Sequence, residues 1–327
     1  MRTGAKWGVA AGLVVLLALA AGALSVWPSV LIIRWIFDLG GVRANAALAH
    51  RVPAGVASRL NESYDAQDPD AHLDVFYPQA VAARGASLLT VVWIHGGGFV
   101  SGSKEQVANY ARILAAGGFT VAAVDYSLAP GSTYPTPLRQ LNRALGYLTR
   151  NAARLHVDAR HLVIAGDSAG AQLGAQLANL VVSSGYARMV GVAPEIEPGQ
   201  LAGVVLYCGP YAMRSMRDNS WFSRTVMRAY SGERQPQRHP LAGTLDLLDL
   251  LAPHFPPAFL SVGNADPLDP QSRQLAAALT DRGARVETVF FAPDYRPPLP
   301  HEYQFDLDLA EAREALRRSQ EFLRTLQ

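Results

Sequence analysis

The chain has 327 residues, of which 50% are apolar and 17% are charged. This composition suits one large domain or two ordinary ones with a sizeable core, and it excludes disorder as the main state. Lysine and arginine number 29 and aspartate and glutamate 27, so a net charge of +2 gives no support to nucleic-acid binding. The single cysteine, Cys208, lies in an apolar run and is interpreted as a small buried side chain, so we expect no disulfide and no structural metal.

The N-terminal segment carries no charged residue from Gly8 to Trp27. As a helix, this stretch would extend about 30 Å, the thickness of the hydrocarbon core of a bilayer. Arg2 and Lys6 precede it, and Trp7 and Trp27 occupy the two interface positions. We therefore predict a membrane anchor in residues 1–28, with the rest of the chain on the exported side, periplasmic or extracellular.

A cleaved signal peptide is the alternative for the same segment. Small residues at Ala18 and Ala20, or at Ala21 and Ala23, suit a signal peptidase, and the protein would then be secreted. Residues 29–61 follow as a connecting or cap segment. Its apolar beginning is expected either to lie against the membrane or to cover the main domain.

The main domain, residues 62–327, alternates short apolar runs with longer helical stretches. This alternation is typical of a mostly parallel central sheet flanked by crossover helices. The predicted strands are Leu73–Tyr77, Leu89–Ile94, Thr120–Asp125, Leu162–Ala165, Gly203–Tyr207, Ala258–Val262 and Val286–Phe291. The predicted helices are Glu105–Ala116, Leu138–Ala153, Ala169–Ser183, Pro270–Arg282 and a final helix through Leu309 and Leu326.

One interval breaks this alternation. About 50 residues separate the strand that ends at Tyr207 from the one that begins at Ala258, whereas a connection in an α/β unit is normally a few residues and one helix. Residues 211–253 are therefore predicted to form a cap insertion above the sheet.

The pentapeptide Gly166-Asp167-Ser168-Ala169-Gly170 joins a predicted strand to a predicted helix. A nucleophilic serine at such a turn stands clear of the backbone only if the residues two before and two after it are small, and glycine meets both needs. A glycine-flanked structural turn is the alternative interpretation. The placement between strand and helix favours Ser168 as a nucleophile.

A second motif, His95-Gly96-Gly97-Gly98-Phe99, directly follows another predicted strand. Glycines let backbone N–H groups approach a reacting carbonyl and stabilise the oxyanion of acyl transfer. Neither a Walker pattern nor a dinucleotide fingerprint is present, which disfavours a phosphate-binding loop.

A nucleophilic serine needs a histidine base and an acid that orients it, and in hydrolases of this topology the acid precedes the histidine. His301 is the one histidine beyond the last predicted strands. Asp266 follows a strand at the edge where α/β sheets assemble their sites, so it is the favoured acid. Asp269 and then Asp294 are the alternatives, and Asp269 also suits the first turn of a helix.

These motifs, together with Asp125-Tyr126-Ser127-Leu128-Ala129-Pro130 and Asp266-Pro267-Leu268, resemble the hormone-sensitive-lipase-like branch of the α/β-hydrolases. The resemblance covers about Leu73 to the end of the chain. It implies a triad of Ser168, His301 and Asp266. It further implies an oxyanion hole from the backbone of Gly97, Gly98 and Ala169, and a cap made of N-terminal residues and the insertion.

The expected function is that of a serine carboxylesterase acting on short- to medium-chain acyl esters through an acyl-enzyme, with no cofactor. The expected partners are a small-molecule ester and, through the N-terminal helix, a membrane. Alternatives are a lipase on longer lipid esters, an acyltransferase or amidase, and a membrane-tethered, noncatalytic hydrolase-like binding protein. One departure from the family is Glu302, where a glycine usually follows the histidine; its carboxylate is expected to raise the pKa of His301 or to narrow the site.

Overall fold

The structure is a computed structural model that describes residues 25–213 and 220–327. Among these residues, eight strands form one sheet in the order β1-β2-β4-β3-β5-β6-β7-β8. The strands are β1 (Val56–Ser63), β2 (His72–Pro78), β3 (Leu88–Ile94), β4 (Thr120–Val124), β5 (Val157–Asp167), β6 (Leu201–Tyr207), β7 (Ala258–Ser261) and β8 (Val286–Val289). β1 pairs antiparallel with β2, as does β2 with β4, and all other pairs are parallel.

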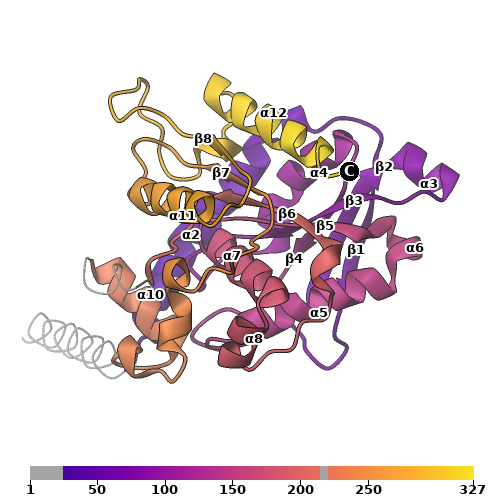
Figure 1. Cartoon of the computed structure of the whole chain (residues 1–327). Coiled ribbons are helices and arrows are strands. Elements are labelled where there is room, and N and C mark those ends of the chain that lie inside the picture. The colour runs from indigo at the N-terminus through magenta and orange to yellow at the C-terminus, as the bar shows by residue number, and fades with distance from the viewer. Residues whose placement is uncertain (1–24, 214–219) are drawn as a thin grey trace, which may run out of the picture.

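Helices cover both faces of this sheet (Figure 1). The helices of the described residues are α2 (Trp27–Ala47), α3 (Gln79–Arg84), α4 (Ala108–Ala116), α5 (Thr136–Arg150), α6 (Ala152–Leu155), α7 (Ala169–Val182), α8 (Ser184–Val190), α10 (Trp221–Ser231), α11 (Asp269–Asp281) and α12 (Ala310–Arg324). Side chains of a strand point alternately to its two faces. In β3, Val92 and Ile94 join the core beneath α5 and α7, while Val91 and Trp93 join the core beneath α4 and α12.

The predicted mostly parallel sheet is confirmed, and the seven predicted strands correspond to β2 through β8. The eighth strand, β1, was not predicted. Its sequence, VASRLNES, is mainly polar, and its side chains are exposed or half-buried because β1 lies at an edge of the sheet. An edge strand therefore lacks the apolar run on which the prediction of the inner strands depends.

The predicted membrane anchor, residues 1–28, lies outside the described residues except for its last four positions. Among the residues that the structure describes, no helix is both long enough and apolar enough to cross a bilayer.

The following segment forms α2, which covers the main domain with one of its faces. Arg34 donates from Nε to Val100 O at 2.7 Å and from Nη2 to Ala129 O at 3.1 Å. Asp38 accepts a hydrogen bond from Ser101 Oγ at 2.6 Å. α2 is thus fastened to the chain just beyond the HGGGF motif.

The interval between β6 and β7 supplies α10, which is followed by three short 3-10 helices, Pro236–Arg238, Ala242–Leu245 and Leu247–Asp249. α10 lies beside α2 (Figure 1), and the rings of Phe37 and Phe222 are 5.5 Å apart. The N-terminal segment and the insertion therefore meet above one edge of the sheet, which positions both of them over the site described next.

Candidate active site

Ser168 lies between the end of β5 and the start of α7, with φ 51° and ψ −119°. A Cβ atom on Gly170 would lie 2.0 Å from Ile94 O, and one on Gly166 would lie 2.6 Å from the carbonyl carbon of Gly170. Both positions therefore require glycine, for the steric reason that the sequence analysis gave. The turn is further held by a hydrogen bond from Ser168 N to Tyr207 O at 2.8 Å.

Three side chains that are far apart in the sequence meet at the carboxyl edge of the sheet. His301 Nε2 lies 3.0 Å from Ser168 Oγ, and His301 Nδ1 lies 2.8 Å from Asp266 Oδ2. The Asp266 side chain is fully buried, and its other oxygen accepts a hydrogen bond from Leu268 N at 2.8 Å. An ionised Asp266 favours the tautomer with the proton on Nδ1, which leaves Nε2 free to accept the serine proton.

The other two candidate acids lie elsewhere. Asp269 is in the first turn of α11 and forms an ion pair with Arg273 at 2.9 Å, as its alternative interpretation anticipated. Asp294 is exposed in the loop after β8. Of the three candidates, all within the described part of the chain, Asp266 is the one that the structure brings to His301.

The HGGGF loop follows β3 beside Ser168. Gly97 has φ 105°, and a Cβ atom there would lie 2.1 Å from Ser101 O, so the backbone permits no side chain. Gly98 has φ 61°, and its Cβ would lie 3.5 Å from Phe222 and 3.6 Å from Phe37. The glycine loop thus lies between the nucleophile turn and the cap. Ala169, the third residue predicted for the oxyanion hole, opens α7, where backbone N–H groups have no intrahelical partner.

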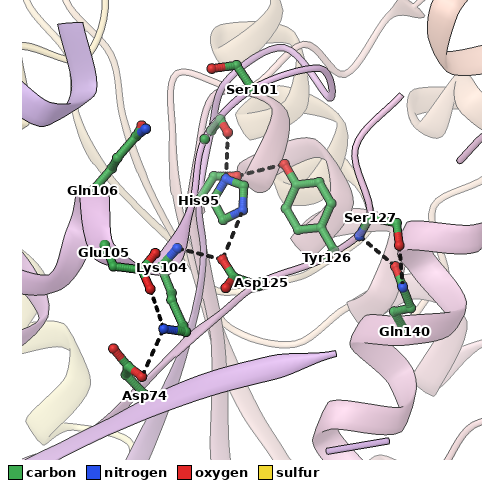
Figure 2. Close-up of polar contacts among 12 residues, drawn as sticks. Asp74, His95, Ser101, Lys104, Glu105, Gln106, Asp125, Tyr126, Ser127 and Gln140 are labelled. Carbon is green, nitrogen blue, oxygen red and sulfur yellow. Dashed lines mark hydrogen bonds and ion pairs between the residues drawn. The ribbon is translucent and has the colours of Figure 1, made fainter. Parts of the chain in front are cut away.

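His95 supports this loop from below (Figure 2). Its ring stacks on Tyr126 with centroids 4.4 Å apart, and its Nδ1 donates to Gly96 O at 2.8 Å. Tyr126 Oη donates to His95 O at 3.0 Å. Burial lowers the pKa of His95 to about 4, so the imidazole is neutral at physiological pH and serves as a donor to the loop.

Charged groups are buried beneath His95 (Figure 2). Lys104 is 2% exposed, and its Nζ lies 3.2 Å from Asp74 Oδ1 and 2.8 Å from Asn61 Oδ1, with Glu105 as a further partner. The Lys104 backbone N–H donates to Asp125 Oδ1 at 2.7 Å. Burial raises the pKa of Asp125 to about 7. This network fixes the segment that closes the glycine loop.

The sequence analysis did not predict the two hydrogen bonds that Asp167 accepts. Asp167, next to Ser168, accepts hydrogen bonds from Trp93 Nε1 and Gly96 N, each at 2.8 Å, and so ties the nucleophile turn to the glycine loop. Burial and the neighbouring Glu302 carboxylate hold the pKa of Asp167 well above its usual value. The position of Asp167 inside the pentapeptide was the available signal, but its partners are 71 and 74 residues away.

Glu302 stands close to the histidine, with Oε1 3.7 Å from His301 Nε2. Burial by itself lowers the pKa of His301, but Cys208, Asp266 and Glu302 act in the opposite direction and hold that pKa well above its usual value. Burial also raises the pKa of Cys208 to about 11, so this thiol is uncharged at neutral pH. The carboxylates of Asp266 and Glu302 are therefore the charges that favour the imidazolium.

Cys208 is buried, as predicted, but it also borders the site. One potential metal-ligand atom from each of Cys208, Asp266 and His301 lies within 4.8 Å of the others. Because His301 Nδ1 and Asp266 Oδ2 already bond each other, an ion at this position would compete with that hydrogen bond. The sequence signal for Cys208 was its place directly after the apolar strand that ends at Tyr207.

Comparison with known proteins identifies the family. A family model described as alpha/beta hydrolase fold matches residues 91–295. The chain belongs to the α/β-hydrolase family. The resemblance of its motifs to the hormone-sensitive-lipase-like branch is thereby confirmed.

Among curated relatives of this α/β-hydrolase is carboxylesterase NlhH of Mycobacterium tuberculosis (strain H37Rv), which is 31% identical over 257 residues and covers 75% of each chain. The ethyl acetate hydrolase of Pseudomonas putida is 28% identical over 227 residues, which make up 68% of this chain and 67% of that protein. Both matches span most of the catalytic domain predicted from the sequence.

Solved structures share the fold. Esterase B from Lactobacillus rhamnosis has a TM-score of 0.79 at 23% identity, covering 91% of this chain and 96% of its own. The esterase of Pyrobaculum calidifontis has a TM-score of 0.71 at 24% identity and covers 91% of both chains. At these identities the likeness concerns the backbone arrangement of the α/β-hydrolase.

Proposed function

We propose that this α/β-hydrolase is a serine carboxylesterase in which Ser168 is the nucleophile, His301 the base and Asp266 the orienting acid. The observation that carries the proposal is the continuous hydrogen-bonded chain from Ser168 Oγ through both ring nitrogens of His301 to Asp266 Oδ2. The names of the curated relatives, a carboxylesterase and an ethyl acetate hydrolase, support an ester as the substrate.

In the first half of the reaction, Ser168 Oγ attacks the ester carbonyl carbon while His301 Nε2 accepts the hydroxyl proton. The tetrahedral intermediate collapses as the imidazolium returns this proton to the leaving alcohol, and an acyl-serine remains. In the second half, His301 takes a proton from water, which attacks the acyl carbon. The acid leaves, and the proton returns to Ser168.

The oxyanion formed in both halves would be stabilised by the backbone N–H groups of Gly97, Gly98 and Ala169. The requirement for glycine at position 97 and the position of Ala169 at the start of a 14-residue helix support this role. Asp266 fixes the tautomer of His301 and stabilises its charged form, without itself taking the proton.

Short- to medium-chain acyl esters are the proposed substrates. A lipase acting on longer lipid esters is the second candidate, and the exposed apolar face of α2 described below favours it. A noncatalytic binding protein is disfavoured, because such proteins usually lack a reacting side chain and this chain has all three.

We further propose that residues 1–28 anchor the enzyme in a membrane with the catalytic domain on the exported side. A cleaved signal peptide followed by secretion is the alternative. The uncharged sequence from Gly8 to Trp27 supports both.

The test is hydrolysis of p-nitrophenyl esters from acetate to palmitate by the wild type and by Ser168→Ala. The wild type is expected to cleave the shorter esters, and the variant to lose turnover by about five orders of magnitude while its melting temperature stays unchanged. Ser223→Ala, another buried serine, is the matched control. Wild-type turnover in Ser168→Ala would refute the assignment.

A further inference from the structure

The outward face of α2 is apolar. Seven large apolar side chains of this helix are exposed, and they are Trp27 (43%), Leu31 (54%), Ile32 (54%), Trp35 (69%), Ile36 (52%), Leu39 (39%) and Val42 (57%). They recur at intervals of three or four residues, so they share one side of the helix. We call this surface the α2 outer face.

A helix at the surface of a soluble domain normally places its charged residues outward and its apolar ones inward. In α2, all of which the structure describes, this order is reversed. Arg34 and Asp38 are turned to the protein and hydrogen-bonded there, and Arg43 is the one charged residue with an exposed side chain. The inner face also buries Val30 and Ile33. An exposed patch of such size on one helix marks an interaction surface.

The inner side of α2, opposite the α2 outer face, borders the candidate active site. Phe37 of α2 packs against Phe222 of α10, and the preceding Trp221 is 50% exposed. The same two phenylalanine rings are the nearest neighbours of a Cβ placed on Gly98. The helix that carries the α2 outer face therefore also borders the loop that is proposed to hold the oxyanion, but with its opposite side, because Phe37 is four residues after the buried Ile33.

Two observations identify the occupant as a lipid bilayer. The chain enters α2 directly from the uncharged stretch Gly8–Trp27, so a bilayer that takes up this stretch must lie next to the first turn of α2. Trp27, Trp35 and Trp221 are of the residue type that is enriched at membrane interfaces.

Charge supports the same occupant and indicates its lipid composition. The segment from Trp221 to His239 contains four arginines, among them the exposed Arg234 and Arg238, and one acidic residue, Glu233. Arg43 adds an exposed positive charge on α2 itself. Apolar side chains flanked by arginines suit the headgroup region of an anionic bilayer.

We propose that the α2 outer face lies in the headgroup region of an anionic bilayer, and that the enzyme takes its ester substrate from that bilayer. This inference rests on the proposed esterase function and specifies its substrate class as esters whose acyl chain partitions into lipid. Because α2 borders the glycine loop with its inner side, an outer face seated in the bilayer would hold the candidate active site close to the lipid surface.

The first test measures the environment of the face independently of activity. The full chain is reconstituted in vesicles of phosphatidylcholine and phosphatidylglycerol, with a fluorophore on Ile36→Cys or, as control, on Leu60→Cys. Leu60 is equally exposed (52%) but lies on the edge strand β1, and the native Cys208 is buried and escapes labelling. Quenching by iodide from water and by doxyl-labelled lipid from the bilayer is then compared.

The label at residue 36 is expected to be quenched by doxyl lipid and protected from iodide, and the label at residue 60 to show the reverse. Quenching of residue 36 by iodide alone would place the face in water and overturn the proposal. Protection from both quenchers would place a second protein copy on the face and overturn it equally.

The second test compares the full-length wild type with Ile32→Glu/Trp35→Glu, with Leu60→Glu as control. The double variant is expected to hydrolyse vesicle-embedded p-nitrophenyl palmitate about tenfold more slowly, which corresponds to about 1.4 kcal/mol, and p-nitrophenyl acetate at the wild-type rate. Equal loss on both esters, or on neither, would contradict a role in taking substrate from lipid. A wild type that cleaves neither ester would instead refute the proposed function, while the quenching result would still stand.

Discussion

The interior beneath the glycine loop and the α2 outer face depart from the usual distribution of residues in opposite directions. Beneath the loop, charged and polar groups such as Lys104, Asp74 and His95 are almost fully buried. On α2, large apolar side chains such as Trp35 are exposed. Buried polar groups and exposed apolar patches are the informative exceptions in a globular protein, because each carries a cost that ordinary residues avoid.

The difference between the two regions lies in where their partners are. Each buried charge beneath the loop has its partner within the chain, such as Asp74 for Lys104. The side chains of the α2 outer face have none among the described residues and require an external one. The first region therefore serves rigidity near the reacting atoms, and the second serves association.

The largest effect on stability is expected from Lys104→Met. This change leaves Asp74 buried without its cation and should lower the free energy of unfolding by about 3–5 kcal/mol, measured by chemical denaturation. Arg317→Met, which removes exposed ion pairs of α12 with Glu314 and Glu321, should cost less than about 1 kcal/mol. Equal losses in the free energy of unfolding would mean that the buried network stabilises the protein no more than an exposed ion pair does.

Gly97→Ala should reduce kcat by a factor of about 100 to 1,000, because a Cβ at this position displaces the loop that carries the proposed oxyanion donors. Gly85→Ala is the matched control: it also has positive φ, 62°, but a Cβ there meets no atom within 4 Å. The control should lose about 1 kcal/mol of stability and no activity. Steady-state kinetics of both variants decide the point, and unchanged kcat in Gly97→Ala would contradict the role of the loop.

Alanine substitutions of two isoleucines, one on each face of α2, compare how much each face contributes to stability. Ile33 is 3% exposed and Ile36 is 52% exposed. Ile33→Ala should lower the free energy of unfolding by about 2–4 kcal/mol, and Ile36→Ala should change it by less than about 0.5 kcal/mol. A large loss for Ile36→Ala would show that the outer face is already covered within the protein.

Glu302→Gln is expected to have the smallest effect. Activity requires a neutral His301, and the Glu302 carboxylate raises the pKa of this imidazole, so removal of the charge lowers that pKa. The acid limb of kcat/KM should therefore move to lower pH. Because glutamine keeps the size and backbone conformation of Glu302, the shift reports charge alone. An unmoved acid limb would exclude this influence.

The sequence predicted the inner strands and placed the candidate site residues because their requirements are local. Gly166 and Gly170 are needed by one turn, and His301 was found because no other histidine follows the last strands. Constraints of this kind can be recognised from the residue types within a short stretch of sequence. The strand β1 has no recognisable local pattern, because an edge strand that is exposed to solvent needs no run of apolar residues.

The contacts that sequence reasoning missed depend on distant segments. Asp167, at the end of β5, binds Trp93 of the neighbouring strand β3. Cys208, directly after β6, meets Asp266 and His301, which follow β7 and β8. For α2, both expected placements, over the domain and against a membrane, concern the same helix. Its inner face covers the domain, and its outer face remains a proposal that the sequence raised and the exposure of its side chains supports.

The central claim, that Ser168 is a nucleophile activated by His301, is tested most directly by covalent labelling. The full-length protein is treated with a fluorophosphonate, and the modified peptide is identified by mass spectrometry. The account predicts one phosphonylated residue, Ser168, and labelling slower by several orders of magnitude in His301→Gln. Modification of a different serine, or an unchanged rate in His301→Gln, would contradict it.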